Sequence, residues 1–167
     1  EYTLNDLDSL HDLGVISHLD YYFSKTMAGI YKKASGLTVL SAALASQALS
    51  RGHLCLDLDA VSGTSLQTAE GKTVLTLPGL SAWLEDLNKN GMAALEPERP
   101  DDDDQRSWVA RHPLVLDRDN NLYLAKYYDF QHRLINVIEN FISRNANFRS
   151  DIKTDNFCDQ FILNFKT

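Results

Sequence analysis

A helix that is apolar on almost all sides constrains the fold of this chain more than any other feature of the sequence. It runs from about residue 37 to residue 50, and most of its residues are leucine, alanine or valine. A helix without a broad polar face is usually buried at the centre of a domain. Gly52 stands where a residue of left-handed conformation would end it. We therefore expect a central, buried helix that ends at Gly52.

The pattern changes period directly after this helix. In the sequence HLCLDL, residues 53–58, every second residue is a leucine. This two-residue period is typical of a strand with one buried face. The sequence therefore predicts a short strand near residues 53–58.

Several other segments have the period of amphipathic helices. They lie near residues 3–13, 17–30, 80–90, 126–141 and 155–165, and residues 113–124 are typical of a β-hairpin with its turn at 117–120. We predict a mainly α fold with a small β component (α+β), with about six helices. In the helix from residue 126 we expect these side chains to point inward: Tyr127, Phe130, Leu134, Val137, Ile138 and Phe141.

Composition favours one reduced, cytoplasmic domain. The chain has 167 residues, of which 44% are hydrophobic, so it can bury a substantial core. We predict this domain over residues 1–146, followed by a C-terminal helical segment at 147–167. Cys55 and Cys158 lie far apart without metal-binding spacing. No apolar run reaches the roughly 20 residues that cross a bilayer, so we expect no membrane partner.

The charge argues against autonomous binding of nucleic acid. The net charge is -7, and the basic residues are scattered along the sequence. Proteins that bind DNA or RNA tightly cluster their cations to neutralise phosphates. We therefore expect no direct DNA contact by this chain.

Two sequence motifs resemble binding sites only superficially. Gly71, Lys72 and Thr73 match the end of a phosphate loop, but Leu66 stands where the loop needs its first glycine. We interpret this tripeptide as a turn and predict no cofactor site. Residues 92–107 contain two prolines and the four acids Asp101–Asp104, which favour a solvated loop over a packed element or a metal site.

Histidines and tyrosines supply the remaining candidate residues. His11 and His18 lack partner carboxylates at metal-ligand spacing, so we interpret each as a lone surface or interface residue. Tyr21, Tyr22 and Tyr31 lie on the expected helix faces and are candidates for an interface, although the sequence does not separate interface from core.

Three strings of the sequence resemble one protein family. They are SRGHLCLDL after the alanine-rich helix, PLVLDRDNNLYLAKYYDFQHRLINVI, and more weakly ISHLDYYFSKTMA. In order and spacing they are similar to the N-terminal region of RecD, the alpha subunit of bacterial exodeoxyribonuclease V, and they span most of residues 14–142. The chain departs from the family at Asp57, where proline is frequent, and in its acidic loop.

The resemblance implies a role in double-strand break repair and recombination. The parent chain would be an ATP-dependent 5'-3' DNA helicase subunit whose motor domains, which bind ATP and Mg, follow this region. This segment would dock on the gamma and beta subunits (RecC and RecB), reach DNA only through the whole complex, and carry no catalytic residue, cofactor or metal.

Two alternatives stay open at this point. The chain could be a stand-alone hydrolase or nuclease that uses His53, Asp57 and Asp59, because the first two lie on one face of the expected strand. It could also be an unrelated helical protein-interaction domain, which would differ from the first reading only in its partner.

Overall fold

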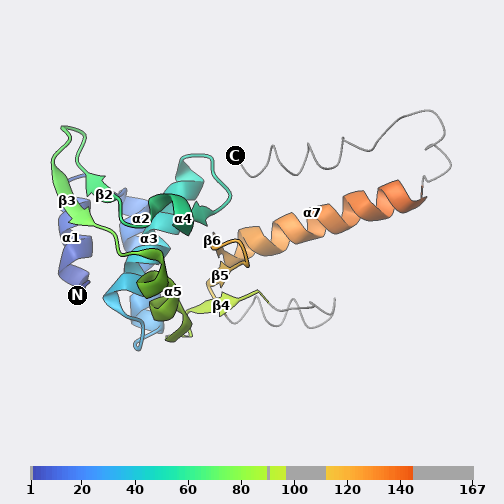
Figure 1. Cartoon of the computed structure of the whole chain (residues 1–167), viewed down its shortest axis with the longest axis horizontal. Coiled ribbons are helices and arrows are strands. Elements are labelled where there is room, and N and C mark those ends of the chain that lie inside the picture. The colour runs from blue at the N-terminus through green and yellow to red at the C-terminus, as the bar shows by residue number, and fades with distance from the viewer. Residues whose placement is uncertain (1, 90, 97–111, 145–167) are drawn as a thin grey trace. The chain divides into compact units, whose positions relative to one another are not determined.

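The computed structural model describes residues 2–89, 91–96 and 112–144 (Figure 1). It divides into two compact units, Glu1–Tyr128 and a second unit that begins at Asp129. The described helices are α1 (Leu4–Asp12), α2 (His18–Ile30), α3 (Gly36–Ser50), α4 (Leu58–Val61), α5 (Leu80–Lys89) and α7 (Ala125–Arg144). The strands are β1 (Leu56–Asp57), β2 (Ser65–Gln67), β3 (Thr73–Thr76), β4 (Ala93–Leu95), β5 (Leu114–Leu116) and β6 (Asn121–Leu124). The prediction of a mainly α fold with a small β component is confirmed.

Helix α3 is the centre of the first unit, as its sequence predicts. It contacts α1, α2, α5, β1 and β6, and Figure 1 shows it among the other helices. Eleven of its fifteen residues are buried, including small polar ones such as Ser41 and Ser46. Gly52 has φ +91°, and the amide of His53 donates to the Ala48 carbonyl over 3.0 Å. This left-handed turn ends the helix and turns the chain toward β1.

A four-stranded sheet in the order β1-β6-β5-β4 packs beside α3. The β5–β6 hairpin is antiparallel, as predicted, and Asp117 stabilises its turn by accepting hydrogen bonds from the amides of Asp119 (2.9 Å) and Asn121 (2.8 Å). Asn120 takes a left-handed φ of +60° in this turn, which asparagine tolerates better than most residues.

Both faces of the hairpin are buried. Leu114, Leu116 and Leu122 belong to the main core, whereas Val115 and Tyr123 join a second cluster with Tyr128. This alternation follows from the two-residue period of strands. Burial raises the pKa of Tyr123 and of Tyr128 above the usual range of tyrosine, and each hydroxyl donates to a carboxylate, on Asp117 and Glu96 respectively.

The strand after α3 is shorter than the sequence pattern suggests. Only Leu56 and Asp57 pair with β6, and Leu58 already opens α4. The carboxylate of Asp57 accepts a hydrogen bond from the amide of Ala60 over 2.9 Å, so Asp57 is the N-cap of α4. An aspartate that can cap the next helix stops the strand, which alternation of leucines alone does not reveal.

The prediction of a loop from residue 92 is wrong for its first residues. Ala93–Leu95 form β4, which pairs in parallel with β5, and Met92 is fully buried. This short apolar run precedes the first proline and needs only three residues to complete the edge of the sheet. Asp101–Asp104 lie outside the described residues.

The inward orientation expected for one side of α7 is also wrong. Five of the six residues are exposed, by 40 to 68% of their surface: Tyr127, Phe130, Leu134, Val137 and Phe141. The helical period shows that a helix has an apolar side, but it does not show what covers that side. Among described residues of α7, the buried large side chain is that of Tyr128, which the pattern did not single out.

Two glycines give a matched test of helix packing. A Cβ on Gly36, at the start of α3, would lie 2.0 Å from the backbone oxygen of Tyr2, whereas a Cβ on Gly29, inside α2, meets nothing within 4 Å. Gly36→Ala should lower the free energy of unfolding by about 1–3 kcal/mol, because backbone must move. Gly29→Ala should raise it by about 0.5–1 kcal/mol, because alanine favours the helix. Urea denaturation measures both, and equal shifts in one direction would refute this packing.

Candidate docking surface

Helix α2 has one buried and one exposed side. Asp20 and Ser24 are fully buried on the side that packs on α3. On the opposite side Leu19 is 68% exposed, and Tyr22 and Ile30 are each 63% exposed. Spacings of three and eleven residues bring these three side chains to one side of a helix. We call Leu19, Tyr22 and Ile30 the α2 face.

A buried hydrogen-bond network fixes the orientation of the α2 face. The amide and hydroxyl of Ser17 donate to the Asp20 carboxylate over 3.1 and 2.7 Å, and the Asp20 amide donates back to Ser17 Oγ over 3.2 Å. The other Asp20 oxygen accepts a hydrogen bond from Ser46 of α3 over 2.7 Å. Asp20 thus caps α2 and ties it to the central helix, so the exposed side cannot rotate inward without breaking this network.

His11 and His18 lie together beside the α2 face, although the sequence suggests that each is isolated. His11 Nε2 is 2.6 Å from His18 Nδ1, because the short turn after α1 folds the two helices against each other. The ring of His11 stacks on Tyr21, with centroids 4.2 Å apart, and Tyr21 meets Tyr22 edge to face at 5.2 Å. The prediction of two lone histidines is therefore wrong. Their sequence separation of seven residues across a turn gives no signal of this contact.

An ionic contact holds Tyr21 in place. Lys25 Nζ lies 2.8 Å from the carboxylate of Asp8, and the Tyr21 hydroxyl donates to the same oxygen over 2.9 Å. These hydrogen bonds, that from Lys25 first, lower the pKa of Asp8. The bond to Asp8 also raises the pKa values of Tyr21 and Lys25. Among the three candidate tyrosines, Tyr21 and Tyr31 are half-buried, and Tyr22 is the one exposed on the surface.

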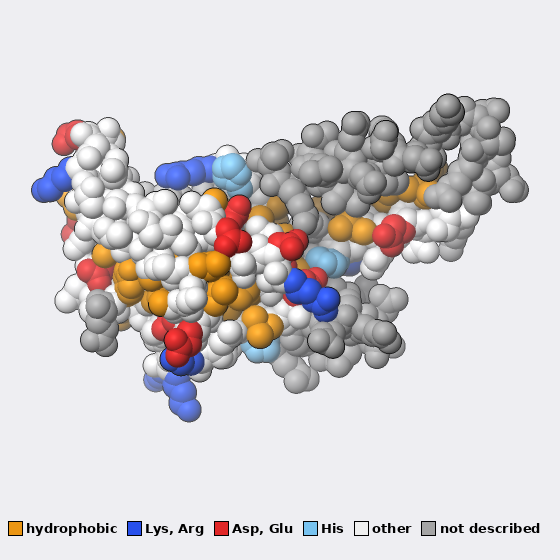
Figure 2. Space-filling view, in the orientation of Figure 1, with side chains coloured by type: hydrophobic (Ala, Val, Ile, Leu, Met, Phe, Trp, Pro, Cys, Tyr) orange, Lys and Arg blue, Asp and Glu red, His pale blue; other side chains and the backbone are white. Residues whose placement is uncertain are grey.

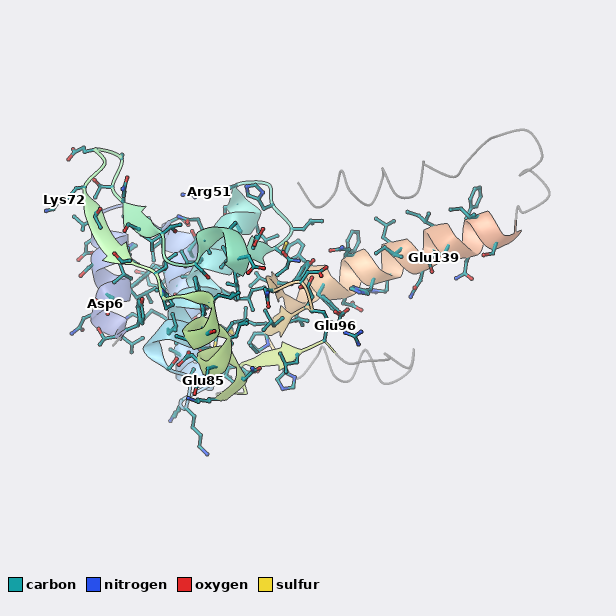
Figure 3. The ribbon with its side chains drawn as sticks, viewed as in Figure 1. Asp6, Arg51, Lys72, Glu85, Glu96 and Glu139 are labelled. Carbon is teal, nitrogen blue, oxygen red and sulfur yellow. The ribbon has the colours of Figure 1, made fainter. Side chains whose placement is uncertain are left out.

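Gly71 and Lys72 lie in the turn of the β2–β3 hairpin, and Thr73 is the first residue of β3. Gly71 has φ +80°, and its amide donates to the Thr68 carbonyl over 2.9 Å. The amide of Lys72 contacts the Thr68 hydroxyl over 3.3 Å, and its side chain lies at the outer end of the hairpin (Figure 3). A phosphate loop directs such amides at its ligand and precedes a helix, whereas here a strand follows.

Two of the three residues in the alternative nuclease hypothesis have structural roles. Asp57 caps α4, and Asp59 accepts a hydrogen bond from the Asn120 side chain over 3.1 Å. His53 is exposed after the end of α3. Within residues 2–89, 91–96 and 112–144, no three histidine, cysteine or acidic side chains gather in a way that could hold a metal ion.

Two features of the described residues concern binding to nucleic acid and to membranes: the distribution of Lys and Arg side chains, and the apolar character of the helices. On the face in Figure 2 the Lys and Arg side chains stand in separate groups rather than in one basic patch. None of the described helices combines the length and apolar character that spanning a bilayer requires.

Comparison with known proteins identifies the family. The profile of "RecBCD enzyme subunit RecD, N-terminal domain" matches residues 12–123, which is more than half of the chain. No curated protein matches the chain. The match covers two of the three strings on which the resemblance rested, residues 16–28 and 50–58, and the start of the third, residues 113–123 of 113–138. The chain therefore belongs to the family of the N-terminal domain of RecD.

Proposed function

We propose that this chain is the docking domain of an exodeoxyribonuclease V alpha subunit and that its α2 face binds the gamma subunit. The observation that carries the proposal is the position of exposed apolar side chains within the stretch shared with the family. Among the described residues of that stretch, five large hydrophobic side chains are exposed. Three of them lie on α2, namely Leu19, Tyr22 and Ile30, and the other two are Leu13 and Leu95.

The chemistry of this face suits a protein partner. Tyrosine is enriched in protein interfaces and among the residues that contribute most of the binding energy, and the buried centre of an interface is more apolar than its rim. The α2 face is also held rigidly by Asp20 and Ser46, so little ordering is needed on binding. With a net charge of -7 the chain is poorly suited to bind the phosphates of DNA directly.

In this proposal the chemistry of the parent enzyme lies outside the chain. ATP and Mg belong to helicase motor domains elsewhere in the alpha subunit, and DNA is reached through the assembled complex with the beta and gamma subunits. The role of this domain is to hold the alpha subunit in that complex. We therefore expect the isolated chain neither to hydrolyse ATP nor to bind a DNA end at physiological salt.

Size-exclusion chromatography tests the proposal. The chain should co-elute with the gamma subunit of the same organism as a complex of one copy each, and not with the beta subunit alone. ATP hydrolysis by the pure chain would contradict the assignment of a non-catalytic domain. Separate elution of chain and gamma subunit would contradict docking.

Variants of the α2 face should weaken this complex. Tyr22→Asp is expected to cost about 2 kcal/mol of binding, about a thirtyfold rise in Kd, because it places a charge in a buried apolar contact. The matched control is Leu4→Asp, which introduces the same charge at a leucine that is 43% exposed in the first turn of α1. Isothermal titration calorimetry measures both. A Kd unchanged by Tyr22→Asp, or raised equally by both variants, would exclude the α2 face.

A further inference from the structure

The exposed side of α7 has the spacing of a coiled-coil seam. Its residues follow one another at intervals of three, four, three and four, and they are exposed by 40, 63, 44, 64 and 68%: Tyr127, Phe130, Leu134, Val137 and Phe141. A repeat of 3.5 residues keeps such a stripe facing a second helix along its whole length. We call these five residues the α7 seam.

A second apolar side runs next to the seam. Ile135, Ile138 and Ile142 are half-buried, in contrast to the exposed seam residues. Helix α7 is therefore apolar on two adjacent sides, and the seam is the one that stays open to solvent. An exposed stripe of aromatic and aliphatic residues along a helix is typical of a surface that binds another helix.

The charges beside the seam are basic on one edge and neutral on the other. In a heptad with Tyr127 at position a, Lys126 and Arg133 occupy position g, and Gln131 and Ile138 occupy position e. The helix has carboxylates at Asp129 and Glu139, but these occupy positions c and f, away from the seam.

These charges select the partner. In coiled coils, residues at e and g pair with oppositely charged residues of the facing helix. A second copy of this chain offers no carboxylate at either position within α7, so it would bring no counter-charge to Lys126 or Arg133 across the contact. An amphipathic helix with acids beside its apolar stripe would supply them. Arg133 already pairs with Asp129 along its own helix, which holds its guanidinium near this edge.

We propose that the α7 seam binds an amphipathic helix of another protein that carries acidic residues along the edge of its apolar stripe that faces Lys126 and Arg133. The seam lies beyond residue 123, where the family match ends, and so does not depend on the proposed binding of the gamma subunit by the α2 face. It is a second interaction surface, specific for charge as well as for apolar contact.

Two synthetic peptides test this proposal on the 167-residue chain. Each spans about three heptads with leucine at a and d, and carries either glutamate or lysine at every e and g position. Fluorescence anisotropy of the labelled peptides measures binding. The glutamate peptide should bind at least about tenfold more tightly than the lysine peptide, and this preference should shrink as salt rises.

Variants connect the binding to the seam. Val137→Asp should abolish binding of the glutamate peptide, because it puts a charge in the middle of the stripe. Asn136→Asp adds the same charge at the neighbouring exposed position and should leave binding almost unchanged. The double variant Lys126→Glu, Arg133→Glu should reverse the preference toward the lysine peptide. The fold is checked by circular dichroism in each case.

Three results would overturn the proposal. One is failure of both peptides to bind, and another is equal binding of the two. The third is a dimer of the unmodified chain in sedimentation equilibrium that Val137→Asp dissociates, because the occupant would then be a second copy.

Discussion

Trp83→Ala should lower the free energy of unfolding by about 3–5 kcal/mol. Trp83 is fully buried in the side of α5 that packs on α3, and its indole Nε1 donates to Ser41 Oγ over 2.6 Å. Ser41 in turn donates to the Leu37 carbonyl over 2.8 Å, so the pair links α5 to the backbone of the central helix. Truncation leaves a large cavity and removes one hydrogen bond, and both effects act in the same direction.

Trp83→Phe separates the two effects. Phenylalanine keeps most of the apolar volume but cannot donate to Ser41, so we expect a smaller loss than with alanine. Phe130→Ala, at a position that is 63% exposed, is the control for removing an aromatic ring from the surface and should change the stability of the fold little. Urea denaturation followed by circular dichroism measures all three. Equal losses for Trp83→Ala and Phe130→Ala would contradict a core position for Trp83.

Asp20→Ala should lower the free energy of unfolding by about 2–4 kcal/mol. The change removes the N3 carboxylate from the capping box of α2, whose N-cap is Ser17, and this accounts for about 1 kcal/mol. It also leaves the hydroxyl of Ser46, which is 6% exposed, without its acceptor, at a cost of about 1–3 kcal/mol. Because Asp20 fixes α2 on α3, the same variant should weaken any complex formed through the α2 face.

Asp6→Ala is the matched control for Asp20. Asp6 occupies the same position in α1, where its carboxylate accepts hydrogen bonds from the amide of Thr3 over 2.7 Å and from its hydroxyl over 2.9 Å. Both of these hydrogen bonds come from Thr3, and neither connects α1 to another helix as the bond from Ser46 connects α2 to α3. Loss of the Asp6 carboxylate should therefore lower the free energy of unfolding by only about 1 kcal/mol. Chemical denaturation of the two variants side by side gives the difference. Similar losses would mean that the bond to α3 contributes nothing.

The sequence predicts those helices and turns whose residues are near one another in the chain and determine the local structure by themselves. Helix α3 is recognisable because almost every residue suits a buried environment, and Gly52 supplies its end. The β5–β6 hairpin is recognisable because Asp117–Asn120 form a turn between two apolar runs. In the same way, Ser17 and Asp20 mark the start of α2, although the burial of Asp20 depends on Ser46, 26 residues further along the chain.

Contacts between distant segments explain the failures. Strand β4 has only three residues, and they form a strand because β5 lies beside them. The prolines that follow suggest a loop, so the sequence alone does not indicate this strand. The short strand at residues 53–58 has a local cause instead, because Asp57 caps α4 through the amide of Ala60. The exposure of the α7 seam is equally invisible in the sequence, because a buried and an exposed apolar stripe have the same period.

The candidate docking surface could be predicted only in part. Sequence reasoning finds Tyr21, Tyr22 and Tyr31 but cannot rank them, since all three suit a helix face. The structure separates these tyrosines by their exposure. Tyr21 donates a hydrogen bond to Asp8 and stacks on His11, whereas Tyr22 is exposed. The contact between His11 and His18 depends on the angle between α1 and α2, for which the sequence has no simple signal.

Photo-cross-linking from the α2 face tests the docking proposal most directly. A benzophenone amino acid replaces Tyr22 in one sample and Lys72, at the outer end of the β2–β3 hairpin, in another. Each protein is irradiated with the gamma subunit, and the products are separated by electrophoresis. We predict a covalent adduct from position 22 and none from position 72. An adduct from position 72 alone, or from neither position, would contradict docking through α2.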